Sequence, residues 1–257
     1  MFVAAVHENR NDSRTFQLIR SSFAAFKFDT VIAEGFPTAW GNNPQRIFDY
    51  AAKTGALVDG FVEGGETIPT VSGAKQQDAR LIGGEPSDTD IKARVSSEGV
   101  TAEDLLGFYV LRNIPQWIGE RKIEGAGDHR LRPLVEAALE RNRQSLAIAS
   151  SVLPTYDRWA DWYFAINRKA IGSGFNPEET GPLTDGRYGS NRIAAAVSRA
   201  RDSHLHELIV ARLNAGESVL VVYGASHLMI QRPALDATLG PPCYVGSDLI
   251  AATRACR

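Results

Sequence analysis

The stretch FVAAVHENRNDSRTFQLIRSSFAAFKFDTVIAEGFP (residues 2–37) decides the fold class. It opens with FVAAV, a short apolar run that is typical of a buried strand. Apolar residues then recur at helical spacing behind Asp12 and Ser13, either of which can cap a helix. A second apolar run, DTVIAEGFP (residues 29–37), is stopped by glycine and proline. Strand, helix and strand in this order predict a βαβ unit, whose parallel strands are joined by a right-handed crossover.

Further strands and helices alternate near both ends of the chain. The apolar run 218–223 predicts a strand, and a long helix over about residues 190–214 precedes it. After the first βαβ unit we expect a helix from Asn43-Pro44 to residue 56 and a loop over 58–73. A short strand with a tight turn at Gly83-Gly84, a helix capped near Ser87, and helices from 101 to about 170 broken at Pro115 follow. The chain is expected to end in a strand over 243–247 and a terminal helix.

These elements predict one α/β domain spanning residues 1–257. We expect a mixed, mostly parallel central sheet flanked by helices, built from residues 1–100 and 190–257. The helical segment 101–189 would form a cap on this core. Its last part, residues 172–190, is rich in glycine and proline, and a loop of that length is typical of a lid or a binding loop.

Composition restricts the class of protein. With 44% hydrophobic and 23% charged residues and a formal charge of −2, the chain resembles an ordinary soluble globule and has no electrostatic footprint for nucleic acid. No apolar run is long enough to span a membrane, and no basic segment precedes the first apolar run as in a signal peptide. We therefore expect a cytoplasmic protein by default, with an exported mature form as the alternative. Nothing in the sequence indicates an oligomeric state.

The two cysteines, Cys243 and Cys256, lie close to the end of the chain. They form neither a CxxC pair nor a zinc-finger spacing. The sequence favours two separate thiols, with a disulfide as the alternative for an exported protein.

Reactive side chains follow several of the predicted strands. His7 follows the first strand, Glu34 ends the second, Glu85 follows the strand near residue 80, and His227 comes after the strand 218–223. In open parallel sheets, ligands bind beyond the carboxyl ends of the strands. We therefore expect His7, Glu34 and His227 to meet at one edge of the sheet and to form a functional site.

Each of these residues also has an ordinary structural explanation. A single histidine at a strand end is often a hydrogen-bonded structural residue, Glu34 could pair with an arginine, and Glu85 could favour the first turn of a helix. It is the joint occurrence of two histidines and a carboxylate that favours a functional site. Two residues of the long helix, Arg201 and Asp202, could reach the same edge.

The other histidines are expected to play no joint role. His204 and His206 lie two positions apart on a helix and cannot both serve one site. His129 lies in an expected loop, where we expect it to be exposed.

A serine nucleophile is the main alternative at the late strand end. Ser226 follows a strand, as in the G-x-S-x-G elbow of α/β-hydrolases, but Leu228 stands where the second glycine should be and no histidine follows His227. The sequence also lacks a P-loop, and no glycine fingerprint for a dinucleotide follows a strand.

The chain resembles the TraB/Tiki superfamily, with its erythromycin-esterase-like and ChaN-like relatives. The late G-x-x-H motif of that family is matched by Gly224-Ala-Ser-His227, its strand-end glutamate by Glu34, and its polar pair before the late motif by Arg201-Asp202. The early motif keeps His7 and has Ala4 in place of glycine. The resemblance implies an α/β fold with a hydrolase site at the sheet edge, dependent on a metal in the Tiki-like branch and metal-free in the esterase-like branch.

Two hydrolytic schemes follow from these residues. In the first, His7, Glu34 and His227 hold Zn²⁺, Mn²⁺ or Co²⁺, which activates a water molecule, while Glu85 acts as general base and Arg201 stabilises the oxyanion. In the second, Glu34 polarises a histidine, which activates the water without a metal. The substrate in both schemes is an ester or amide of a small molecule or peptide.

A non-catalytic binding protein is the competing class. The same two histidines could hold haem or another planar ligand in a pocket lined by aromatic side chains. The candidate lining residues, which could equally be the packed core of the helical region, are Tyr109, Trp117, Trp159, Trp162 and Tyr163.

Overall fold

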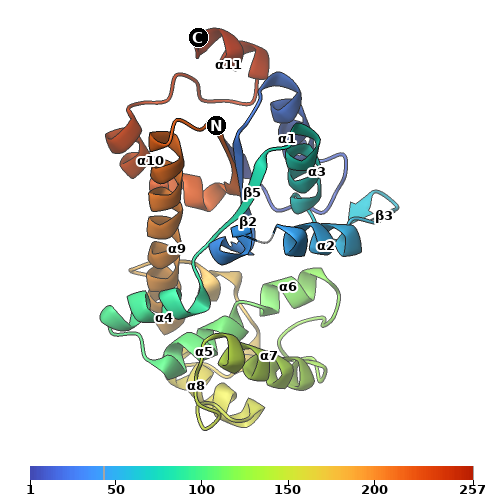
Figure 1. Ribbon diagram of the computed structural model, residues 1–257. Helices are drawn as coiled ribbons and strands as arrows, with labels where there is room; N and C mark the ends of the chain where they lie inside the picture. Colours follow the sequence, from blue (N-terminus) through green and yellow to red (C-terminus); the bar gives the residue numbers. More distant parts are fainter. Residues whose placement is uncertain (43, 257) are drawn as a thin grey trace. The chain divides into compact units, whose positions relative to one another are not determined.

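The computed structural model describes residues 1–42 and 44–256 and shows an α/β protein (Figure 1). The chain divides into two compact units. The α/β unit comprises residues 1–87 and 202–257, and the helical unit comprises residues 88–201. Both boundaries differ from the expected ones, because residues 88–100 and 190–201 belong to the helical unit.

The α/β unit is built on a four-stranded sheet of order β1-β6-β2-β5, and all of its pairs are parallel. The strands are β1 (Phe2–Ala5), β6 (Val219–Gly224), β2 (Thr30–Pro37) and β5 (Arg80–Glu85). The late strand β6 lies between β1 and β2 and is buried along its whole length. Because the strands are parallel, their carboxyl ends lie at one edge of the sheet.

Helices cover both faces of this sheet, as a parallel sheet requires. One face packs on α1 (Arg14–Ala25), α2 (Gln45–Thr54) and α3 (Thr67–Gln77). The other face packs on α10 (Ala225–Leu239) and the second half of α9 (Gly189–Asn214). Figure 1 shows α1 and α3 on one side of the strands and α9 and α10 on the other.

The expected start of α1 is confirmed at atomic detail. The Ser13 side chain accepts a hydrogen bond from the backbone N–H of Phe16 and thereby caps the helix. Pro44 precedes α2 as its N-cap residue, and Asn43, the other residue of the expected start, lies outside the described residues.

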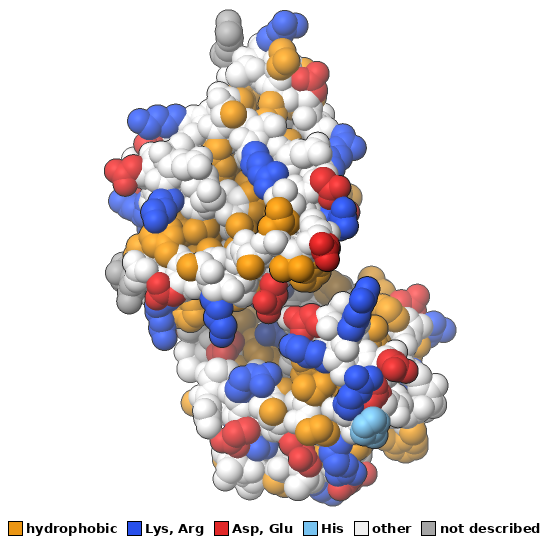
Figure 2. Space-filling view, turned by 90° about the vertical axis from the view of Figure 1, so that its right-hand side faces the viewer, with side chains coloured by type: hydrophobic (Ala, Val, Ile, Leu, Met, Phe, Trp, Pro, Cys, Tyr) orange, Lys and Arg blue, Asp and Glu red, His pale blue; other side chains and the backbone are white. Residues whose placement is uncertain are grey.

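The expected loop over residues 58–73 is wrong in most of its length. The strands β3 (Leu57–Val58) and β4 (Phe61–Val62) form a hairpin, and α3 follows it. Asp59 and Gly60 both have positive φ, which is the Asp-Gly chemistry of a tight hairpin turn. Leu57, Val58 and Phe61 of the hairpin are at least half exposed. The hairpin lies at the right of Figure 1, the side of the molecule that Figure 2 turns toward the viewer.

Two further expectations are wrong. Gly83 and Gly84 do not turn the chain but lie within β5. Close packing explains why both residues are glycines: a Cβ on Gly84 would lie 2.5 Å from the Tyr223 ring, and one on Gly83 would lie 2.1 Å from the Phe36 carbonyl oxygen. Residues 243–247 form no strand.

The helical unit has an aromatic core of its own. Its helices are α4 (Asp88–Ser97), α5 (Ala102–Leu111), α6 (Ile114–Gly119), α7 (Leu131–Ser145), α8 (Tyr156–Asn167) and the first half of α9. The break before Pro115 is confirmed. The five aromatic residues considered as a pocket lining are buried in this core, with exposed fractions of 6% or less.

The segment 172–190 is fixed from the inside by Glu179. This carboxylate is fully buried, and it accepts hydrogen bonds from the Tyr163 hydroxyl and the Lys169 ammonium, each at 2.6 Å, and from the backbone N–H of Asn176 at 2.8 Å. Burial, followed by the hydrogen bond to Glu179, raises the pKa of Tyr163 well above its usual range. The sequence predicted a lid or a binding loop here, and the structure shows a segment that is anchored at Glu179 by buried hydrogen bonds.

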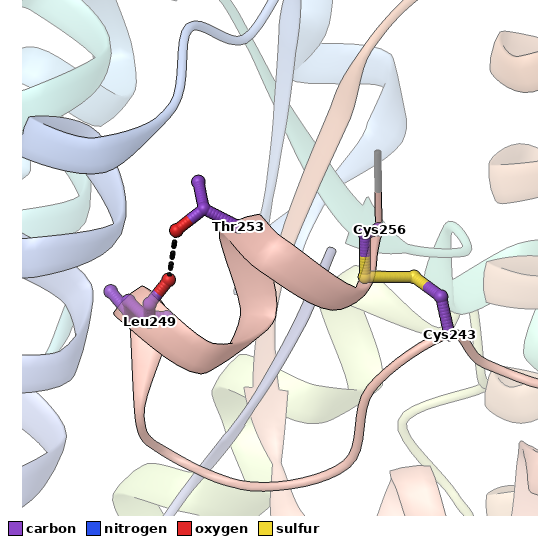
Figure 3. Close-up of a disulfide and its surroundings, with 4 residues drawn as sticks. All are labelled: Cys243, Leu249, Thr253 and Cys256. Atoms are coloured by element: carbon purple, nitrogen blue, oxygen red, sulfur yellow. Dashed lines mark hydrogen bonds between the residues drawn. A yellow bond between two sulfur atoms is a disulfide. The ribbon is translucent and has the colours of Figure 1, made fainter.

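The end of the chain is closed by a disulfide between Cys243 and Cys256 (Figure 3). The loop it closes contains α11 (Leu249–Ala255), in which the Thr253 hydroxyl donates to the Leu249 carbonyl at 2.6 Å. The expectation of two separate thiols is therefore wrong. Across the described residues, no helix combines the length and the hydropathy needed to cross a membrane.

Candidate functional site

Glu34 lies at an irregularity in β2, at the carboxyl edge of the sheet. Between two consecutive register pairs, β2 advances four residues while β5 advances two. Gly35 has a φ of +87°, a conformation that L-residues rarely adopt and that such a bulge requires. A bulge redirects the neighbouring side chain, and here Glu34 Oε2 accepts a hydrogen bond from the backbone N–H of Gly224, at 2.6 Å, at the end of β6.

His7 lies just beyond β1, beside the same carboxylate. Its Nδ1 atom is 2.5 Å from Glu66 Oε1, and its Nε2 atom is 3.8 Å from Glu34 Oε2. The His7 side chain is 60% exposed, whereas those of Glu66 and Glu34 are each 17% exposed. This imidazole therefore stands at the open side of the site.

His227 approaches Glu34 from the first turn of α10. Its Nδ1 atom is 2.6 Å from Asp202 Oδ1, and its Nε2 atom is 3.6 Å from Glu34 Oε1. Both His227 and Asp202 are buried. The Tyr223 ring meets the imidazole edge-on, with 5.1 Å between the ring centroids. Packing and hydrogen bonding together hold this ring in one orientation.

The three groups share a simple pattern of hydrogen bonding. A carboxylate at Nδ1 favours the tautomer in which Nδ1 carries the hydrogen, and the neutral imidazole then presents Nε2 as an acceptor. In both histidines, that Nε2 atom faces an oxygen of Glu34 at slightly more than hydrogen-bond distance. Acceptors that face one another across such a gap favour a water molecule or a shared proton between them.

Gly224 allows His7 and Glu34 to approach each other. A Cβ atom at this position would lie 2.8 Å from His7 Nε2 and 3.3 Å from Glu34 Oε2. The register pair Ala5↔Gly224 explains this crowding, because His7 leaves β1 directly opposite. The late glycine of the Gly224-Ala-Ser-His227 motif is thus required by the packing of the site.

Gly224→Ala is expected to push the His7 ring away from Glu34 while the sheet stays intact. Because a misplacement of about 1 Å can cost about 10²-fold in rate, we expect a loss of kcat/KM of this order. Gly119→Ala is the matched control, since a Cβ there would have nothing within 4 Å. Equal activity of the two variants would show that the His7–Glu34 contact does not matter.

Glu85 belongs to the same edge but makes different contacts. Its Oε1 atom accepts hydrogen bonds from the Tyr223 hydroxyl at 2.6 Å and from the backbone N–H of Gly35 at 3.3 Å. It thereby holds the bulge and the aromatic ring that packs against His227. These contacts favour a positioning role for Glu85, and the general-base role predicted from the sequence stays untested.

Arg201 precedes Asp202 on α9 and belongs to the helical unit. Burial raises the pKa of Tyr109, in the same unit, to about 12, and the Arg201 charge acts in the opposite direction by lowering that pKa. Its predicted role at an oxyanion stays a prediction.

The remaining histidines make separate contacts. His204 Nε2 lies 2.7 Å from the Thr38 hydroxyl, and His206 Nε2 lies 3.3 Å from the Thr238 hydroxyl. The expected exposure of His129 is confirmed at 92% of its side chain.

Sequence reasoning missed Glu66, the carboxylate that orients His7. Glu66 is the N-cap residue of α3, the helix that was expected to be part of a loop. A glutamate directly before Thr-Ile-Pro, with proline early in a first turn, was the available signal. The other partner, Asp202, was expected at the site and is found there.

Among the described residues, no three His, Cys, Asp or Glu side chains are arranged as a metal site. The donor types nonetheless suit a divalent ion, because two imidazole Nε2 atoms and one carboxylate face one another and each imidazole is oriented by an outer carboxylate.

Comparisons with protein-family models, curated proteins and solved structures returned no match to this chain.

Proposed function

We propose that the protein is a hydrolase that activates water at His7, Glu34 and His227 and cleaves an ester or amide bond in a small-molecule or peptide substrate. One observation carries the proposal: two imidazoles, each bound at Nδ1 by a carboxylate, direct Nε2 at the same glutamate. The resemblance to the TraB/Tiki superfamily supports the same function.

His227 is the better general base of the two. It is buried, and the Asp202 carboxylate at its Nδ1 stabilises the imidazolium that forms when Nε2 takes a proton from water. The hydroxide oxygen then bonds to the carbonyl carbon of the substrate, and the bond from that carbon to the leaving group breaks.

His7 is the better general acid. Its exposed position gives it access to a departing alcohol or amine, which takes the proton from Nε2 of the His7 imidazolium. Glu34 lies between the two Nε2 atoms and can return a proton from His227 to His7 after each turnover. This cycle conserves protons and consumes one water per bond cleaved.

A divalent metal is the second form of the same proposal. His7, Glu34 and His227 would hold the ion, and Zn²⁺, Mn²⁺ or Co²⁺ would supply a more acidic water molecule and a Lewis acid. In that form Glu66 and Asp202 orient the two imidazoles toward the ion, as outer carboxylates commonly do.

No observation favours haem binding over hydrolysis. The aromatic residues that would line a haem pocket fill the core of the helical unit instead. The binding alternative therefore depends on the two histidines alone.

The test is hydrolysis of a panel of p-nitrophenyl esters of different acyl length and of aminoacyl p-nitroanilides. The wild type, His227→Ala and the control His129→Ala are each assayed after chelation and after addition of zinc, manganese or cobalt. We expect turnover that His227→Ala removes and His129→Ala keeps. Loss of turnover on chelation and its recovery on addition of metal would favour the metal-dependent scheme, and turnover that does not change with chelation would favour the metal-free scheme. Absence of turnover under all conditions, together with a Soret band on haem titration that His227→Ala abolishes, would replace hydrolysis by ligand binding.

A further inference from the structure

Gln231 lies one turn after His227 on α10 and contacts the same carboxylate. It is 3% exposed, and its Nε2 atom donates to Asp202 Oδ1 at 3.2 Å. The same oxygen lies 2.6 Å from His227 Nδ1. We infer that Gln231 is a positioning residue that fixes Asp202 as an acceptor and thereby sets which ring nitrogen of His227 carries the hydrogen. The inference deepens the proposed function and rests on it for its catalytic consequence.

The orientation of the Gln231 amide indicates that its NH₂ group, and not its carbonyl oxygen, makes the important interaction. Among the described residues, its Oε1 atom is buried and has no hydrogen-bond partner. A buried carbonyl without a partner is costly, so this orientation requires a stronger interaction at the other end of the amide. A hydrogen bond from N–H to an ionised carboxylate is such an interaction. Turning the amide over would place two acceptors against each other at Asp202.

Two tautomers of His227 compete because the ring lies between two carboxylates. A hydrogen on Nδ1 is donated to Asp202 Oδ1, whereas a hydrogen on Nε2 would point at Glu34 Oε1, 3.6 Å away. Only the first tautomer leaves Nε2 able to accept a proton from water. A buried carboxylate is costly without hydrogen-bond donors, and Gln231 supplies one to Asp202 at 3.2 Å.

The test measures the tautomer of His227 directly. Isotope-labelled histidine NMR distinguishes a hydrogen on Nδ1 from one on Nε2 through the ring nitrogen shifts. Gln231→Met removes the donor at similar length, and Gln231→Glu keeps the shape of the amide while replacing its NH₂ group. Gln77→Met is the matched control, because the Gln77 amide donates to the backbone carbonyls of Phe23 and Phe26, each at 2.7 Å.

We expect wild type and Gln77→Met to show His227 with the hydrogen on Nδ1. Both Gln231 variants should show a second population with the hydrogen on Nε2. On any panel substrate that the wild type cleaves, kcat should fall about tenfold in the Gln231 variants with KM unchanged, as for loss of a hydrogen bond to a charged group.

The inference is overturned if both Gln231 variants are folded, by circular dichroism, and keep the wild-type tautomer. It is overturned equally if Gln77→Met changes the tautomer as much as they do. If the tautomer changes as expected while the wild type cleaves nothing in the panel, the positioning role of Gln231 stands and the proposed function fails.

Discussion

Glu34→Gln is expected to lower kcat/KM for ester or anilide hydrolysis by about 10²–10⁴-fold, the usual contribution of general acid–base catalysis. The amide has nearly the same shape, and its carbonyl oxygen can still accept from the backbone N–H of Gly224. It loses the charge that faces both imidazoles and the second acceptor, Oε1, which faces His227 Nε2 at 3.6 Å. The bulge should therefore survive while proton transfer between the imidazoles fails.

Glu85→Gln is the matched comparison for this variant. Glu85 lies on the neighbouring strand, and its Oε1 atom accepts hydrogen bonds from the Tyr223 hydroxyl and the backbone N–H of Gly35. An amide oxygen can accept the same two hydrogen bonds, so we expect a loss of less than about tenfold, corresponding to one weakened hydrogen bond. Steady-state kinetics of the two variants identifies the acting carboxylate. A greater loss in Glu85→Gln would return the general-base role to Glu85.

Glu179→Ala is expected to have the largest effect on stability. The substitution leaves the Lys169 ammonium and the Tyr163 hydroxyl without their buried partner, in addition to the backbone N–H of Asn176. Breaking a buried pair by removing one member costs about 3–5 kcal/mol. We expect this loss in the free energy of unfolding of the helical unit, measured by urea denaturation, together with faster hydrogen exchange in segment 172–190.

Glu178→Ala is the control for this prediction. Glu178 is next in the sequence, and its carboxylate pairs with Arg187 where both side chains are largely exposed. Exposed pairs of this kind contribute about 0.2–1 kcal/mol. A similar cost for the two variants would mean that the buried network does not anchor segment 172–190.

The core of the fold and half of the site were predictable because buried parallel strands have a simple sequence pattern. β1, β2 and β6 appear as short apolar runs, so the residues at their ends, His7, Glu34 and His227, could be identified from the sequence. The parallel sheet then brings them to one edge, as the structure confirms.

The parts that could not be predicted depend on contacts between distant segments. Gly83-Gly84 resembles a turn locally, and only the Tyr223 ring packed against β5 explains the glycines within a strand. The pairing of Cys243 with Cys256 likewise depends on how the last loop folds back. Glu66 was missed because α3, with Pro69 and Gly73, has little helical periodicity.

Gln231 is a different case, since its signal was present in the sequence. It lies four positions after His227 on a helix that follows the strand, and residues four apart share a helix face. What the sequence could not supply was the position of Asp202 on α9, which gives the glutamine its partner.

The central claim is that His7 and His227 act at one site through Glu34, and a double-mutant cycle in kcat/KM tests it most directly. Residues that act as a unit are strongly non-additive. We therefore expect the double variant His7→Ala/His227→Ala to be no slower than the worse of the two single variants. Losses that multiply in the double variant, or a wild-type rate in either single variant, would contradict the account.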